Sequence, residues 1–125
     1  MPIRVLLVVD NIELAYLTSR LLERDGIFVE CVGDHIQAIE ESNRGRYDGI
    51  ILDLDLPRLY GLSVCRELVH RTGVPILVVD GSNGQTAGRR PLCDYIREPF
   101  TSDELLSRIR AAVRRGPRRP EAGPC

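Results

Sequence analysis

The feature of this sequence that most restricts its fold is a short apolar run, Ile50–Leu52, that ends on Asp53. The run is brief and rich in β-branched residues, which favours a buried parallel strand over a helix. A second apolar run, Val5–Val9, ends in the same way on Asp10. In open α/β sheets the ligand site lies at the carboxyl ends of the strands, so both acids are expected there. Two carboxylates side by side require a cation, a shared proton or a covalent modification.

Strand-like runs alternate with helical patterns along the chain, and this alternation predicts a doubly wound parallel sheet with helices on both faces. The expected strand order is 2-1-3-4-5, which places the strands that end near Asp10 and Asp53 next to each other. The expected strands are Ile3–Val9, Ile27–Val32, Ile50–Leu52, Val74–Val79 and Leu92–Ile96. The expected helices are Ile12 to about Arg24, one around Ile36–Ile39, one around Leu62–Val69, and a last helix capped by Thr101 or Ser102.

One segment departs from this alternation. Asp80–Pro91 holds three glycines and a proline and has almost no apolar residue that could fix a helix to the sheet. We therefore expect the fourth of the alternating helices to be weak or absent. Further along, the Glu98–Pro99 bond is a candidate for the cis form.

Composition places the chain among ordinary globular domains. Its 125 residues are 43% hydrophobic and 28% charged with a net charge of −1, which favours neither nucleic acid nor membrane as a direct partner. The four cysteines form no CxxC pair, so reduced thiols and a cytoplasmic location are expected. Residues 1–115 read as one domain, and 116–125 read as a linker or truncation tail that is rich in proline, glycine and arginine.

The arrangement of these residues resembles the receiver domain of two-component response regulators, over residues 3–115. The last helix is similar to that of the OmpR-type subclass, in which a winged-helix DNA-binding domain follows; that domain would lie outside this chain. The resemblance implies a flavodoxin-like or CheY-like fold. It rests on Val8-Val9-Asp10, on Ile51-Leu52-Asp53 with Pro57 and Gly61, on Pro75–Val79, and on Asp94-Tyr95-Ile96 followed by Pro99-Phe100.

The resemblance also implies a set of roles. Asp53 would accept a phosphoryl group from a histidine kinase, beside a Mg²⁺ held by Asp10, Asp53 and the backbone carbonyl of Asp55. Mg²⁺ is needed there because the attacking carboxylate and the incoming phosphate are both anions. A lysine and a Thr or Ser would hold the phosphoryl oxygens. Tyr95 matches the aromatic residue that reorients in the active state.

Three positions depart from this pattern. Asn11 replaces the second acid of the first strand, Asp80 takes the Thr/Ser position, and Glu98 takes the lysine position. An acid at Asp80 would repel an incoming phosphate by about 1 kcal/mol or more. Arg97 could replace the lysine only if its side chain faced the pocket, against the alternation of a strand. We therefore expect Mg²⁺ to be absent or weakly bound. The simpler alternative, open at this stage, treats Asp80 and Glu98 as solvent-facing acids and Tyr95 as an aromatic at the edge of the core.

The function expected from these residues is regulatory and not enzymatic. The chain would be an atypical receiver that acts as a dimerisation and interaction module of a transcription factor, with little or no phosphorylation of Asp53. Its expected partners are a second copy and a histidine kinase or a small ligand, with DNA bound only through the missing domain and no membrane contact. Candidate residues for salt bridges between the two copies are Asp94, Glu104, Arg108 and Arg110, unless these form a solvated helix face with a Glu104–Arg108 pair.

Two other functions stay open. The first is a normal receiver that a histidine kinase switches by phosphorylating Asp53. The second is a phosphatase, because Asp53-Leu54-Asp55 also resembles the DxD motif of haloacid-dehalogenase-type enzymes. Those enzymes carry the motif on their first strand, whereas here it follows the third expected strand and precedes Pro57.

Overall fold

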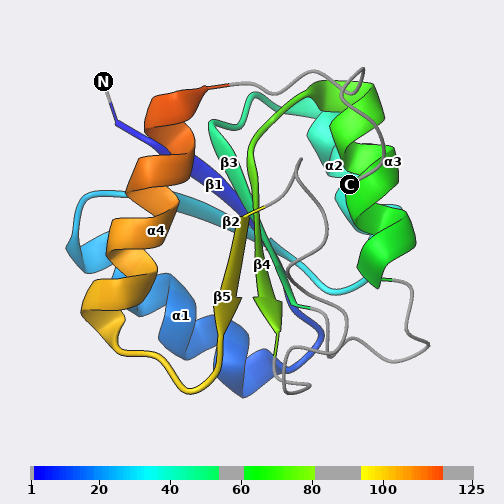
Figure 1. Ribbon diagram of the computed structural model, residues 1–125. Coiled ribbons are helices and arrows are strands. Elements are labelled where there is room, and N and C mark those ends of the chain that lie inside the picture. Colours follow the sequence, from blue (N-terminus) through cyan, green and yellow to red (C-terminus); the bar gives the residue numbers. More distant parts are fainter. Residues whose placement is uncertain (1, 54–60, 81–93, 117–125) are drawn as a thin grey trace.

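The computed structural model describes residues 2–53, 61–80 and 94–116. They form a five-stranded parallel sheet with the order β2-β1-β3-β4-β5, as predicted. Helices α1 and α4 cover one face of the sheet, and α2 and α3 cover the other (Figure 1). The strands are β1 (Arg4–Val8), β2 (Phe28–Val32), β3 (Gly49–Asp53), β4 (Ile76–Asp80) and β5 (Asp94–Arg97). The helices are α1 (Ile12–Arg24), α2 (His35–Arg44), α3 (Gly61–Thr72) and α4 (Ser102–Arg115).

Side-chain caps fix where the helices begin. The amide oxygen of Asn11 accepts a hydrogen bond from the Leu14 backbone N–H at 3.0 Å, which starts α1 at the predicted residue. Thr101, and not Ser102, caps α4. Its hydroxyl accepts from the Glu104 N–H at 3.1 Å, while the Glu104 carboxylate accepts from the Thr101 N–H at 2.8 Å.

Strand boundaries differ from the expected ones by one or two residues. Strand β4 begins at Ile76 and not at Val74, because Gly73 turns the chain with φ +69° and the Thr72 hydroxyl accepts from the Val74 N–H at 3.0 Å. The expected fourth helix falls on 81–93, which lies outside the described residues. The Glu98–Pro99 peptide bond is cis, as proposed from the sequence.

The core consists of two apolar layers, one on each face of the sheet. Leu6 on β1 packs toward α2 and α3, and its neighbour Leu7 packs toward α1 and α4. All five residues of β3 are buried, as expected for a central parallel strand. Each fully buried leucine contributes about 1.5–3 kcal/mol relative to an exposed one.

Helix α4 approaches β3 closely at Gly49. A Cβ atom at this position would lie 3.1 Å from Ile109 Cδ1 and 3.1 Å from Val113 Cγ2. The absence of a side chain on Gly49 therefore lets α4 pack directly onto the sheet. None of the described helices is both long and apolar enough to span a bilayer.

Candidate functional site

The two acids singled out from the sequence lie at the same end of neighbouring strands. Strands β1 and β3 are hydrogen-bonded partners, with Val8 opposite Leu52, so Asp10 and Asp53 both follow at their carboxyl ends. Their environments differ: Asp53 is only 5% exposed, whereas Asp10 is exposed. Asp53 is the charged side chain that the described part of the fold buries.

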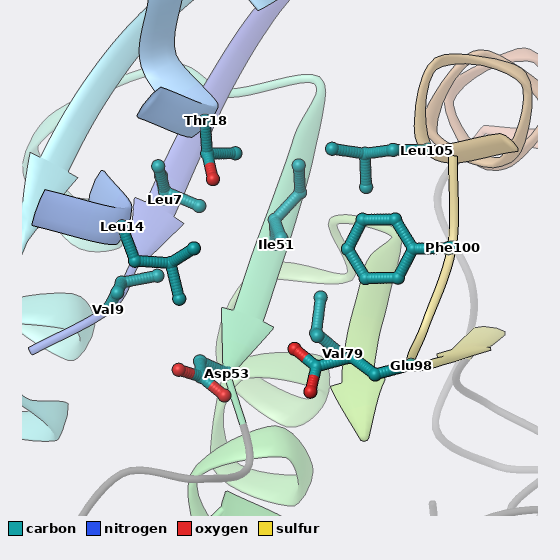
Figure 2. Close-up of a pocket in the computed structure, with 10 residues that line it drawn as sticks. All are labelled: Leu7, Val9, Leu14, Thr18, Ile51, Asp53, Val79, Glu98, Phe100 and Leu105. Atoms are coloured by element: carbon teal, nitrogen blue, oxygen red, sulfur yellow. The ribbon is translucent and has the colours of Figure 1, made fainter. Parts of the chain in front are cut away.

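A small pocket lies beside Asp53, between α1, α4 and the sheet (Figure 2). Its volume is about 30 Å³, which is room for about one water molecule. Figure 2 shows the carboxylates of Asp53 and Glu98 at the same end of this pocket, with apolar side chains above them. The lining residues are Leu7, Val9, Leu14, Thr18, Ile51, Asp53, Val79, Glu98, Phe100 and Leu105.

Glu98 directly follows β5 and brings an acid to this pocket. Glu98 is exposed, but its side chain lines the same pocket as the side chain of Asp53. Arg97 is exposed and is not one of the residues that line the pocket. The pocket therefore combines two carboxylates with apolar walls and the Thr18 hydroxyl.

The site has fewer charged metal ligands at the end of β1 than the resemblance implies, because Asn11 replaces an acid. The side-chain oxygen of Asn11 already accepts the α1 capping hydrogen bond. Within 2–53, 61–80 and 94–116, no three acidic, histidine or cysteine side chains gather in a way that could hold a metal ion. Asp55 lies outside the described residues, as does the side chain of Asp80, the last residue of β4. Asp10 and Asp53 are two described carboxylates at this end of the sheet, and such a pair is compatible with a weakly held Mg²⁺.

Tyr95 lies on β5 opposite Val78 and is partly buried against the core layer that α2 and α3 cover. Its backbone carbonyl accepts a hydrogen bond from the Arg108 guanidinium at 2.7 Å. The position of Tyr95 thus fits an aromatic at the edge of the core, and it links the strand to α4.

The four residues expected between two copies all have contacts within this chain. Glu104 belongs to the α4 cap and Arg108 donates to Tyr95, so both members of the expected i,i+4 pair are engaged elsewhere. Arg110 contacts the carboxylate of Asp25 and donates to its backbone carbonyl at 3.0 Å. Asp94 pairs with Arg115. Sequence reasoning missed Asp25 and Arg115, because no local pattern links positions that far apart.

A parallel sheet of this order, with an acid buried at the end of its central strand, is the arrangement expected of the receiver modules used in signalling. The comparison with known families agrees: the response regulator receiver domain matches residues 5–110. The chain belongs to this family.

Individual proteins support the same assignment. The chain is 37% identical to Sensory transduction protein RegX3 of Mycolicibacterium smegmatis, over 95% of this chain and 54% of the relative. It is 38% identical to Response regulator MprA of Mycobacterium sp. (strain KMS), over 99% of this chain and 55% of the relative. It thus spans about half the length of these curated relatives.

Among solved structures, the receiver domain of sensor histidine kinase PA1611 from Pseudomonas aeruginosa PAO1 has a TM-score of 0.77 and 30% identity to this chain. The match covers 90% of this chain and 98% of that one. That receiver was solved with a magnesium ion coordinated in its active-site cleft.

Proposed function

We propose that this chain is an atypical receiver domain of a response-regulator transcription factor, in which Asp53 undergoes little or no phosphorylation. The observation that carries the proposal is the shared pocket of Asp53 and Glu98. An incoming phosphoryl group would meet a carboxylate where the resemblance implies a lysine. Like charges about 4 Å apart repel by about 1 kcal/mol in water and by more at a protein surface.

The metal ligands support the same proposal. Asp10 and Asp53, together with the carbonyl of Asp55 that the resemblance implies, would hold a Mg²⁺, which when bound would screen the two carboxylates from an incoming anion. Asn11 adds no charge, and its side-chain oxygen already accepts the capping hydrogen bond. Weak metal binding would therefore compound the repulsion from Glu98.

The proposed role is regulatory rather than catalytic. The module would act by dimerising and by contacting other proteins in the cytoplasm, and it would reach DNA through a winged-helix domain beyond residue 125. Its basic segment from Arg114 onward and its coverage of about half of the relatives' length support a second domain. Because Asp53 ends β3 and not the first strand, the phosphatase alternative is not proposed.

The alternative is a phosphorylatable receiver that a histidine kinase switches. The retention of Asp53 and Asp10 at adjacent strand ends favours it, as does the aromatic Tyr95 on β5. This alternative predicts that Asp53 reacts despite Glu98.

The test is reaction with acetyl phosphate and Mg²⁺, followed by intact-protein mass spectrometry. Wild type is expected to gain no phosphoryl group. The double variant Asn11→Asp/Glu98→Lys is expected to gain one, and the further change Asp53→Asn should abolish it. Stoichiometric labelling of wild type that disappears in Asp53→Asn would establish the switched receiver instead.

A further inference from the structure

A groove lies at the amino ends of the strands, at the end of the sheet opposite to the Asp53 pocket. Arg4 and Phe28 are the first residues of β1 and β2, and Tyr47 precedes the start of β3 by two residues. The groove has a volume of about 340 Å³, within the roughly 300–1,000 Å³ of pockets that hold a small molecule. It is therefore large enough for an arginine side chain. The residues that line this amino-end groove are Arg4, Glu23, Phe28, Val29, Glu30 and Tyr47.

Backbone hydrogen bonds hold the strands that form the amino-end groove. The Phe28 N–H donates to the Ile3 carbonyl at 2.8 Å, and the Asp48 N–H donates to the Arg4 carbonyl at 2.7 Å. The Arg4 guanidinium lies over the ring of Tyr47, 5.4 Å from its centroid. Because these contacts fix the surroundings of the groove, an occupant would find it already formed, which lowers the cost of binding.

The amino-end groove presents an aromatic ring and two acids to an occupant. Phe28 is 60% exposed, and Glu30 lies two residues further along β2, so their side chains point to the same face of the sheet. Glu23 and Glu30 are exposed, and within residues 2–53, 61–80 and 94–116 neither has an ion-pair partner. A guanidinium group both stacks on aromatic rings and pairs with carboxylates. An arginine side chain therefore complements this surface.

We propose that Arg118 and Arg119, which follow α4 in the sequence, dock in the amino-end groove of their own chain. One guanidinium stacks on the ring of Phe28 and pairs with Glu30, and the other pairs with Glu23. Docking fixes the direction in which the chain leaves the domain. The inference does not depend on whether Asp53 is phosphorylated, because the groove lies at the other end of the strands.

The position where α4 ends supports this occupant. Val113, in the last turn of α4, packs against Gly49 at the start of β3, since a Cβ on Gly49 would lie 3.1 Å from Val113 Cγ2. Tyr47 of the groove comes two residues before Gly49. Gly116 ends α4 with φ +79°, so the chain leaves the helix at the amino ends of the strands (Figure 1).

The distance to the groove is within reach of the segment. Strand β1 separates β3 from β2, so the two strands lie about 10 Å apart. The three residues from Gly116 to Arg119 span up to about 10 Å when extended, and an arginine side chain adds to this reach. Arg110 of α4 also donates to the carbonyl of Asp25, in the turn between α1 and β2. Helix α4 thus already contacts a neighbour of the groove.

Charge and tethering both favour this segment over a separate partner. Two arginines match two unpaired acids in number and sign. Each exposed ion pair is weak, but a short tether gives an effective concentration in the millimolar range, so weak contacts can hold the segment. A separate protein would need a much larger contact area for a stable complex.

The first experiment is NMR of the 125-residue chain. Nuclear Overhauser effects are expected between the Phe28 ring protons and the δ-methylene protons of Arg118 or Arg119. Arg118→Gln/Arg119→Gln should shift the Phe28 ring and Val29 methyl resonances. Arg97→Gln is the control, because Arg97 is exposed on β5 at the opposite end of the sheet. The absence of these Overhauser effects in wild type, or equal shifts in the control, would overturn the proposal.

The second experiment tests the two acids with a peptide of residues 116–121 added to the Arg118→Gln/Arg119→Gln chain. A saturable shift of the Val29 methyl groups is expected, and no shift with a peptide that carries glutamine at both arginine positions. Adding Glu23→Gln/Glu30→Gln to the chain should weaken binding about two- to tenfold. Glu13→Gln is the matched control, because Glu13 is exposed on the first turn of α1 and does not line the groove.

Two outcomes of the peptide experiment contradict the assigned contacts. Binding that is unchanged in Glu23→Gln/Glu30→Gln would show that the acids do not hold the arginines. Equal weakening by Glu13→Gln would show a general attraction to the acidic surface in place of a site. Both outcomes are independent of the acetyl phosphate experiment, so a chain that is not phosphorylated and shows no docking refutes only this inference.

Discussion

The guanidinium of Arg115, in the last turn of α4, pairs with the carboxylate of Asp94 at the first residue of β5. Asp94 was expected, from the resemblance to receivers, to pair with a second copy. In this structure the chain's own last helix engages it. A dimer that uses this face would have to compete with contacts inside each subunit.

Arg115→Ala should therefore strengthen a dimer formed across β5 and α4. Both side chains of the pair are partly exposed, so the pair contributes at most about 1 kcal/mol and its loss should tighten dimerisation by no more than about fivefold. Sedimentation equilibrium measures the effect, with the exposed neighbour Arg114→Ala as control. A weaker dimer in Arg115→Ala would show instead that Arg115 contributes across the interface.

Gly49→Ala should destabilise the fold by about 1–3 kcal/mol, because the new methyl group would press against Ile109 and Val113. Urea unfolding measures the free-energy change. Gly33→Ala is the control, since its Cβ would meet only Gln37 Oε1, at an ordinary 3.8 Å. Equal stability of the two variants would mean that α4 can shift away from β3 without cost.

The raised pKa of Tyr47 predicts that the free energy of unfolding falls at alkaline pH. Burial, and then the hydrogen bond that its hydroxyl donates to Glu41 at 2.5 Å, raise the pKa of Tyr47 above its ordinary value of 10.0. The folded state therefore holds this proton more tightly than the unfolded state. The resulting stability is complete below pH 10 and is lost as the pH rises above the unfolded-state pKa toward the folded-state pKa.

Urea unfolding between about pH 8 and pH 11 tests this expectation. Tyr47→Phe should remove part of the alkaline decline and should cost about 1 kcal/mol at neutral pH, through loss of the hydrogen bond. Tyr16→Phe is the control, because Tyr16 is 58% exposed. An identical alkaline decline in wild type and Tyr47→Phe would contradict the proposed cause.

The architecture could be predicted because its signals are local. Apolar runs such as Ile50–Leu52 identify strands, and Asn11 marks the start of α1 by its capping chemistry. The rule that ligands bind at carboxyl strand ends then predicts that Asp10 and Asp53 lie at the same edge of the sheet.

The contacts between distant segments could not be predicted in this way. The contact of Arg110 with Asp25 depends on how α4 packs beside the turn after α1, which no periodicity encodes. The apolar walls of the pocket likewise depend on which turn of α1 faces the sheet. The spacing of Leu14 indicated a helix but not a pocket, and Thr18 gave no signal of its own. Glu104 could pair either with Arg108 or with the Thr101 backbone N–H. In the structure its carboxylate accepts from Thr101, and Arg108 donates to the Tyr95 carbonyl.

The hydrogen bond from Arg108 to the Tyr95 carbonyl also has a consequence for the edge of the sheet. Among the strands in the described part of the chain, β5 lies at one edge of the sheet. An edge strand can recruit a strand from another chain through its unpaired backbone groups. Arg108 covers one acceptor on this strand with a charged donor. An incoming strand would have to displace that guanidinium first, which makes pairing at this position of the edge less favourable.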